Sequence, residues 1–143
     1  MVLLNRNHFS ESVVRKTISS GSPLEAPIGF SRACRIGHHI AVSGTAPIKD
    51  GQTVFYNDVY QQTKYCLALS IAAIEEAGGS LSGVIRTRVM LTDITKWQEA
   101  AKAHGELFAE LKPACTFVEV SGFIDKEWLV ETEVDCIVNE QNE

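Results

Sequence analysis

A stretch near the C-terminus alternates between two kinds of side chain, and this pattern limits the possible folds more than any other feature. One set of alternate positions is mostly apolar: Trp128, Val130, Thr132, Val134, Cys136 and Val138. The other set holds Glu131, Glu133 and Asp135 with Leu129 and Ile137. Because successive side chains of a β-strand point to opposite faces, the pattern predicts a strand over residues 128–138. This strand needs a sheet with one dry face and one polar face.

Two helices are predicted from apolar residues at helical spacing. The first spans residues 58–77, carries the stripe Val59, Thr63, Cys66, Ser70, Ala73, Ile74 and Ala77, and ends at Gly78–Gly79. The second spans about 95–111, carries the stripe Trp97, Ala100, Ala101, His104, Leu107, Phe108 and Leu111, and ends before Pro113. Both stripes predict helices that pack on the dry face of a sheet.

The remaining strands are predicted over residues 13–18, 34–42 (in two pieces), 85–91 and 115–120, and residues 19–29 are predicted to form a loop. The order β-β-α-β-α-β-β predicts an α+β fold, a mixed sheet with two helices packed on one face. The length of 143 residues fits a single domain, 1–143. Since nothing is left to cover the other face of the sheet, we expect it to be buried by self-association.

Charge and hydropathy exclude several kinds of partner. The net charge is −5, and Lys and Arg form no basic cluster, so we expect no nucleic acid partner. The nearest approach to such a cluster is the set Arg32, Arg35, Arg86 and Arg88. We expect these arginines to face solvent, or one of them to reach a cleft from a neighbouring subunit. No apolar run reaches the ~20 residues that span a bilayer. Residues 1–9 do not resemble a signal peptide, which predicts a cytoplasmic protein without a membrane partner.

The four cysteines, Cys34, Cys66, Cys115 and Cys136, are widely spaced and form no CxxC pair. In a cytoplasmic protein this spacing predicts reduced thiols and no zinc site. No histidine accompanies the acidic residues 131–135, so the sequence predicts no metal and no cofactor.

Four segments resemble the Rid (YjgF/RidA-like) family: IGHHIAVSGTAPI at 36–48, RTRVMLTDITKW at 86–97, PACTFVEV at 113–120 and VETEVDCIV at 130–138. Together they cover most of the chain between residues 29 and 138, the expected core of a Rid-like domain. The resemblance implies a chorismate-mutase-like fold. It also implies a homotrimer with a small-molecule site in each of three clefts between subunits.

The same resemblance assigns the site residues. Glu131 falls on the glutamate that handles the attacking water in deaminating relatives. Cys115 falls where those relatives carry an arginine that binds the substrate carboxylate, and Thr116 and Phe117 follow it in the substrate site. Phe30 replaces a tyrosine near the cleft. Ser43 and Gly44 match a Ser-Gly step whose backbone approaches the ligand.

Each of these residues also has a purely structural interpretation. Glu131 is either a general acid/base or one member of a solvated acidic strip. Cys115 is better explained as a residue that lines a pocket than as a nucleophile, because no base is adjacent to it. A thiol offers one weak donor where a guanidinium offers two charge-assisted bonds, so we expect a larger or less anionic ligand at that end.

Three functional hypotheses follow. The first is a trimer that hydrolyses an enamine or imine, not necessarily a 2-imino acid, to a carbonyl compound and ammonia. The second is a non-catalytic trimer that binds or senses a metabolite in the same cleft. The third, an endoribonuclease or translation inhibitor, follows older names of the family and conflicts with the acidic charge.

Overall fold

A computed structural model describes residues 14–139 and contains a six-stranded mixed sheet with strand order β1-β2-β3-β8-β6-β7. The strands are β1 (Arg15–Ile18), β2 (Ala33–Ile36), β3 (His39–Thr45), β6 (Val84–Leu91), β7 (Ala114–Glu119) and β8 (Val130–Ile137). Only β6 and β7 run parallel; the other neighbouring pairs are antiparallel. The predicted strands are therefore confirmed, although the first one begins at Arg15. Val13 and the segment 1–9 lie outside the described residues.

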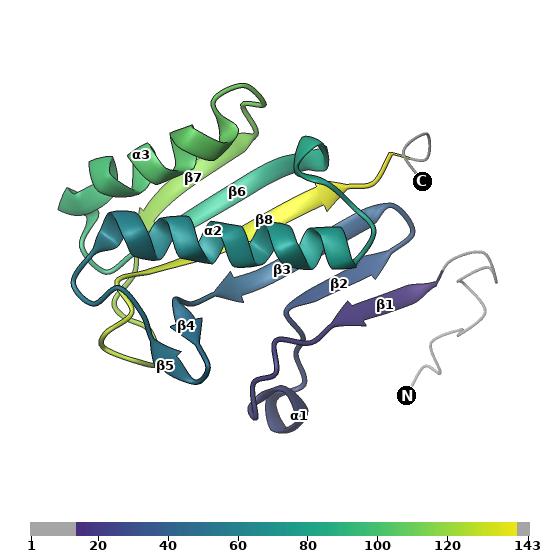
Figure 1. The fold of residues 1–143 in the computed structure, drawn as a ribbon, viewed down its shortest axis with the longest axis horizontal. Helices are drawn as coiled ribbons and strands as arrows, with labels where there is room; N and C mark the ends of the chain where they lie inside the picture. The colour runs from purple at the N-terminus through teal and green to yellow at the C-terminus, as the bar shows by residue number, and fades with distance from the viewer. Residues whose placement is uncertain (1–13, 140–143) are drawn as a thin grey trace, which may run out of the picture.

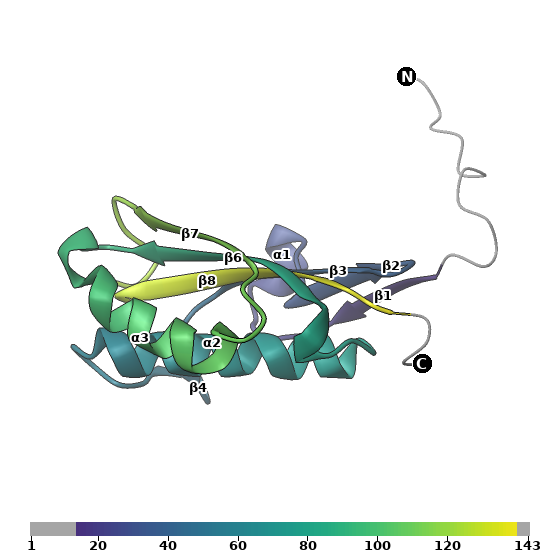
Figure 2. The ribbon, with the colours of Figure 1, turned by 90° about the horizontal axis from the view of Figure 1, so that it is seen from above.

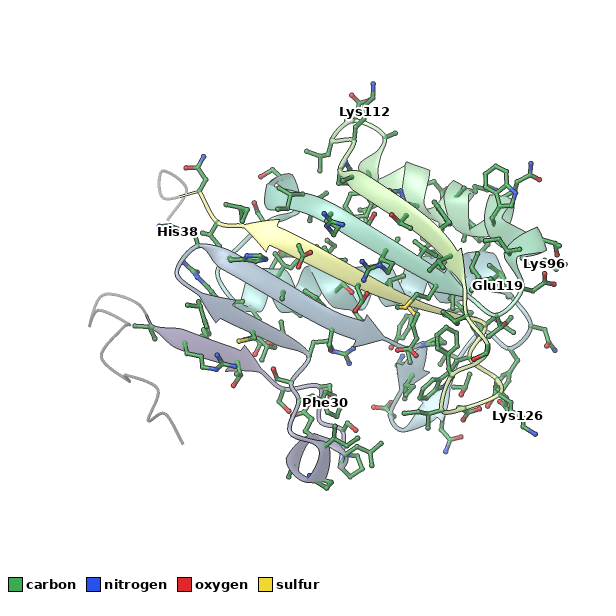
Figure 3. All side chains as sticks on the ribbon, turned by 180° about the vertical axis from the view of Figure 1, so that it is seen from behind. Phe30, His38, Lys96, Lys112, Glu119 and Lys126 are labelled. Atoms are coloured by element: carbon green, nitrogen blue, oxygen red, sulfur yellow. The ribbon has the colours of Figure 1, made fainter. Side chains whose placement is uncertain are left out.

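Two long helices, α2 (Val59–Glu76) and α3 (Trp97–Phe108), lie side by side on one face of this sheet (Figures 1 and 2). This arrangement confirms the predicted α+β fold with two helices on one face. The opposite face of β3, β8 and β6 is not covered by any helix of the described chain, and we call it the open face (Figure 3). None of the helices within residues 14–139 is long and apolar enough to cross a membrane.

Smaller elements refine the predicted boundaries. The segment expected to be a loop contains a single helical turn, α1 (Glu25–Ile28), and a short hairpin of β4 (Ile48–Lys49) and β5 (Gln52–Thr53) precedes α2. A 3₁₀ turn, η2 (Leu81–Gly83), leads into β6. The second helix starts later than predicted because residues 94–96 form another turn, η3. The Asp93 carboxylate accepts hydrogen bonds from the backbone N–H and the hydroxyl of Thr95, which favours this tight turn.

The core lies between the helices and the covered face of the sheet. Along β8, Val130, Thr132, Val134 and Cys136 are all at most 1% exposed, as the alternating pattern predicts. From α2, most of the predicted stripe is buried against them, including Cys66, Ser70 and Ile74. Trp97, by contrast, is 47% exposed at the start of α3 and does not anchor the core of this chain.

A buried glutamine joins α2 to the segments on either side of the sheet end. The Gln62 amide donates to the backbone carbonyls of Val54 (3.3 Å) and Glu127 (3.1 Å), and its carbonyl accepts from the backbone N–H of Leu129 (2.8 Å). Gln62 is fully buried, so these three bonds satisfy an amide side chain that has no access to water. They hold the entry to β8, and therefore Glu131, against the first turn of α2.

We predict that Gln62→Leu lowers the free energy of unfolding by about 2–4 kcal/mol, because it removes three hydrogen bonds that a fully buried side chain makes to the backbone. Gln98→Leu is the matched control, since Gln98 is exposed on α3 and its loss should change stability by less than about 0.5 kcal/mol. Urea denaturation of both variants measures the difference. Equal stability of the two variants would contradict the role assigned to Gln62.

Candidate functional site

The three alternating acids of β8 all point to the open face, but they have different partners. Glu133 forms an ion pair with Arg88 (2.6 Å), and Asp135 lies 3.8 Å from Arg86 and 3.5 Å from His39. Together these charges line a hollow of about 490 Å³ that extends to Ser31, Cys34, Ala41 and Ser43. Glu133 and Asp135 are thus explained as partners of the arginines on β6.

Glu131 differs from its two neighbours because no cation within residues 14–139 pairs with it. Burial raises the pKa of its carboxyl group, and repulsion by the Glu133 carboxylate raises this pKa further. A carboxyl group whose pKa is raised in this way transfers protons more readily near neutral pH than an ordinary surface glutamate does. The environment of Glu131 therefore suits a general acid/base.

The Ser43–Gly44 step brings the backbone of β3 against this carboxyl group. Between the pairs Val42–Val134 and Thr45–Thr132, β3 advances three residues while β8 advances two, so Ser43–Gly44 forms a bulge. A Cβ atom on Gly44 would lie 3.0 Å from Oε1 of Glu131. Any side chain at this position would therefore press on the carboxyl group, which would have to shift by a few tenths of an ångström. Three residues assigned from the sequence, Ser43, Gly44 and Glu131, are brought together.

On its other side, the bulge is joined to Arg32, the residue just before β2. The Arg32 carbonyl accepts hydrogen bonds from the backbone N–H of Ser43 (2.9 Å) and from its hydroxyl (3.1 Å). Arg32 and Glu131 therefore flank the Ser43–Gly44 step from the two strands that neighbour β3. Phe30 lies two residues earlier, 37% exposed beside α1 (Figure 3).

The residues assigned on β7 lie apart from this group, at the far edge of the sheet. Cys115 pairs with Thr87, whose hydroxyl is 2.8 Å from Nε2 of His104 on α3. The exposed Cys115 side chain is therefore directed to the helix-covered side of this edge strand. Phe117 points to the same side and packs against the core. Thr116 pairs with Arg88 and points to the open face. One chain thus does not bring Cys115, Thr116 or Phe117 to Glu131.

The four arginines that we expected to face solvent have separate roles. Arg86 and Arg88 pair with acids of β8 on the open face, while Arg35 donates to the backbone carbonyls of Gly37 (2.8 Å) and Ala77 (2.8 Å). Arg35 therefore joins the β2–β3 turn to the end of α2, so the solvent-facing prediction is wrong for this residue. Arg32, half-buried beside the bulge, is the residue of this neighbourhood that sequence reasoning did not assign.

A search among the described histidines, cysteines and acids finds no group of three or more placed to hold a metal ion. The four cysteines are free thiols.

Comparison with known proteins gives the family. A family model described as Endoribonuclease L-PSP matches residues 21–138 of this chain. The chain belongs to the YjgF/RidA (Rid) family. A Rid relative of Mycobacterium tuberculosis, Rv2704, has a crystal structure that superimposes with a TM-score of 0.79 at 38% identity. This match covers 87% of this chain and 100% of that one. The likeness confirms the predicted fold.

Two relatives of the chain in sequence are informative. The protein SCO2049 of Streptomyces coelicolor is 40% identical over 127 residues, which cover 89% of this chain and 93% of that protein. A protein of Acinetobacter baylyi named 3-aminoacrylate deaminase RutC is 28% identical over 100 residues, 69% of this chain and 79% of RutC. The deaminase is thus a more distant relative than SCO2049.

We predict that Glu131→Gln stabilises the fold at neutral pH and that the gain disappears under acid conditions. A carboxyl group whose pKa is raised by folding opposes folding once it ionises, so its penalty is absent below its unfolded value and appears as the pH rises through the folded pKa. Thermal unfolding of wild type and variant between pH 4 and 8, about the reference carboxyl pKa and above, measures this difference. Glu75→Gln, at an exposed position of α2, is the control and should show no such trend. A gain in stability that is constant across the pH range would contradict a raised pKa of the Glu131 carboxyl group.

Proposed function

We propose that this Rid protein hydrolyses an enamine or imine of a small metabolite to a carbonyl compound and ammonia, with Glu131 as the general acid/base. The observation that carries the proposal is the Glu131 carboxyl group, which is partly desolvated, has no cation partner among the described residues and lies against the Ser43–Gly44 bulge. The name of the relative RutC, a 3-aminoacrylate deaminase, supports the same reaction class.

The chemistry needs only water and one group that moves protons. The Glu131 carboxylate takes a proton from a water molecule as the water oxygen bonds to the carbon of the protonated imine (iminium), which gives a neutral amino alcohol. The protonated carboxyl group then donates its proton to the nitrogen. The carbon–nitrogen bond breaks with release of ammonia, and the hydroxyl proton returns to the Glu131 carboxylate as the carbonyl forms. An enamine first takes a proton on carbon, which gives the same iminium. A raised pKa helps Glu131 both to accept and to donate the proton.

We further propose that the protein is a homotrimer and that a second copy completes each site. Cys115, Thr116 and Phe117 lie at the edge strand β7, away from Glu131 in the same chain, so a cleft that contains both groups needs two chains. The uncovered open face, where Ile137 is 40% exposed, supports self-association. Free and partly buried cysteines are consistent with a reducing compartment, which we propose is the cytoplasm.

Cys115 bears on the choice of substrate. A thiol cannot replace the two charge-assisted hydrogen bonds that an arginine forms with a carboxylate. We therefore propose that small 2-imino acids, which deaminating relatives bind through that arginine, are poor substrates. The preferred ligand is larger, or less anionic at the end that meets Cys115.

We predict that Glu131→Gln lowers the turnover of imine substrates by at least about 100-fold, since general acid–base catalysis contributes on the order of 10²–10⁴. The assay follows ammonia release from a panel of imines generated in solution. Light scattering should report a trimer for both wild type and variant, which separates loss of chemistry from loss of assembly.

Four outcomes would contradict parts of this proposal. Full activity of Glu131→Gln would remove Glu131 from the mechanism. A wild type that turns over no imine, yet is stabilised thermally by a metabolite, would indicate a non-catalytic binding protein. A stable monomer would remove the two-chain site. RNA cleavage that persists in Glu131→Gln after repeated purification would favour the ribonuclease hypothesis.

We also predict that Cys115→Arg increases the hydrolysis of 2-iminopropionate by at least about tenfold, the effect of one charge-assisted hydrogen bond. Cys115→Met adds comparable bulk without charge and should give no increase. The measurement compares both variants with wild type at equal trimer concentration. Equal rates for Cys115→Arg and Cys115→Met would mean that the guanidinium at position 115 does not reach the substrate.

A further inference from the structure

Arg32 is a cationic side chain beside the candidate site for which the described chain supplies no acceptor. Arg35, Arg86 and Arg88 each hydrogen-bond or pair with a group of the fold. The Arg32 guanidinium forms neither a hydrogen bond nor an ion pair with any residue in 14–139, although it is only partly exposed. A guanidinium has five N–H donors, and removing them from water without partners costs free energy. A guanidinium in this state has donors left to bind an anion.

Within residues 14–139, the one carboxylate that acts on Arg32 does not satisfy it. The Glu25 carboxylate is occupied by three other donors: the backbone N–H and hydroxyl of Ser20, and the hydroxyl of Ser19 (2.9 Å). These bonds hold the carboxylate on the turn before α1, where it acts on Arg32 only at longer range. Burial lowers the pKa of Arg32, and the acidic groups Cys66, Glu25 and Tyr65 offset this only in part.

Arg32 and Glu131 lie on opposite sides of one short backbone segment. The Arg32 carbonyl is joined to Ser43, and the Glu131 carboxyl group lies against Gly44. The charges of Glu131 and Arg32 both act on the buried Cys66 thiol. Burial is the main cause of its raised pKa, and Glu131 raises this pKa while Arg32 lowers it. The backbone of Arg32 and the carboxyl group of Glu131 therefore meet the same two-residue step, Ser43–Gly44.

We propose that Arg32 is the anion-binding residue of this site and that the substrate carries a carboxylate held by its guanidinium, on the same subunit as Glu131. The planar fork of a guanidinium matches the two oxygens of a carboxylate, which fixes the orientation of the ligand as well as its charge. The inference rests on the proposed function for the role of Glu131 but not for the binding itself. It also explains how a chain with Cys115 could still select an acidic substrate, bound from a different direction.

The test measures binding of charged ligands and their neutral counterparts by calorimetry on the full chain. The probes are 2-oxobutanoate and phenylpyruvate, each paired with its methyl ester. We expect wild type to bind at least one acid about tenfold or more tightly than its ester, the effect of one charge-assisted hydrogen bond. Arg32→Gln should abolish this preference, and Arg32→Lys, which keeps the charge but loses the fork, should retain part of it.

Arg15→Gln is the matched control. Arg15 is an exposed arginine at the start of β1. The other end of β1 is Ile18, whose carbonyl accepts a hydrogen bond from the backbone N–H of Arg32. Replacement of Arg15 should therefore leave the preference for the acid unchanged. Circular dichroism and light scattering verify that the variants fold and assemble alike. If Arg32→Gln does not fold, Arg32→Lys decides the test by whether its preference for the acid falls.

A preference that survives in Arg32→Gln, or a wild type with no preference for any acid, would overturn the inference. The outcome is separable from that of the proposed function. An Arg32-dependent preference without turnover would reject the hydrolase and keep the anion site. Turnover that depends on Glu131 but not on Arg32 would keep the hydrolase and reject the anion site.

Discussion

The burial of one face of β8 organises this molecule. β8 lies between β3 and β6 in the sheet, and its residues Val130, Thr132, Val134 and Cys136 are removed from water by α2 and the neighbouring strands. Because side chains alternate along a strand, this burial directs Glu131, Glu133 and Asp135 to the open face. A shift of one residue in register would bury three carboxylates, so the register is strongly determined. Both the fold and the position of the candidate catalytic group follow from this one constraint.

The open face then separates three acids that are equivalent in sequence. Arg86 and Arg88 on β6 neutralise Asp135 and Glu133, whereas Met90 is the β6 residue that pairs with Glu131. On the other side, the bulge of β3 places Gly44 against Glu131. Among the described residues, Glu131 is therefore the acid of this row that is partly desolvated and has no cation partner, which is the condition for a raised pKa. Ser43 in the same bulge bonds to the backbone carbonyl of Arg32, so this one local irregularity adjoins both residues of the proposed site.

Much of the fold could be predicted because it rests on local patterns. The alternation of 128–138 and the helical stripe of 58–77 correspond to β8 and α2, and Gly78–Gly79 follows the end of α2. The predicted start of α3 was less accurate. The hydrogen bonds from Thr95 to Asp93 favour a 3₁₀ turn, which the spacing of hydrophobic residues does not predict. At the site, the family resemblance identified Ser43, Gly44 and Glu131, but Arg32 and Arg35 were indistinguishable from surface arginines. Their partners lie elsewhere in the chain: Ala77 for Arg35, and Ser43 for the backbone of Arg32.

The amino-acid sequence by itself determined which elements form, which of their faces are apolar, and that an acidic row lies opposite the buried side of β8. These properties depend on the periodicity of neighbouring residues, and a local pattern is sufficient for them. Only the tertiary structure decided which acid has no cation and which half-buried arginine has no acceptor within residues 14–139, and that Cys115 lies on an edge strand far from Glu131. These properties depend on strand order, on register and on a single bulge, which bring together residues as distant as Arg32, Gly44 and Glu131.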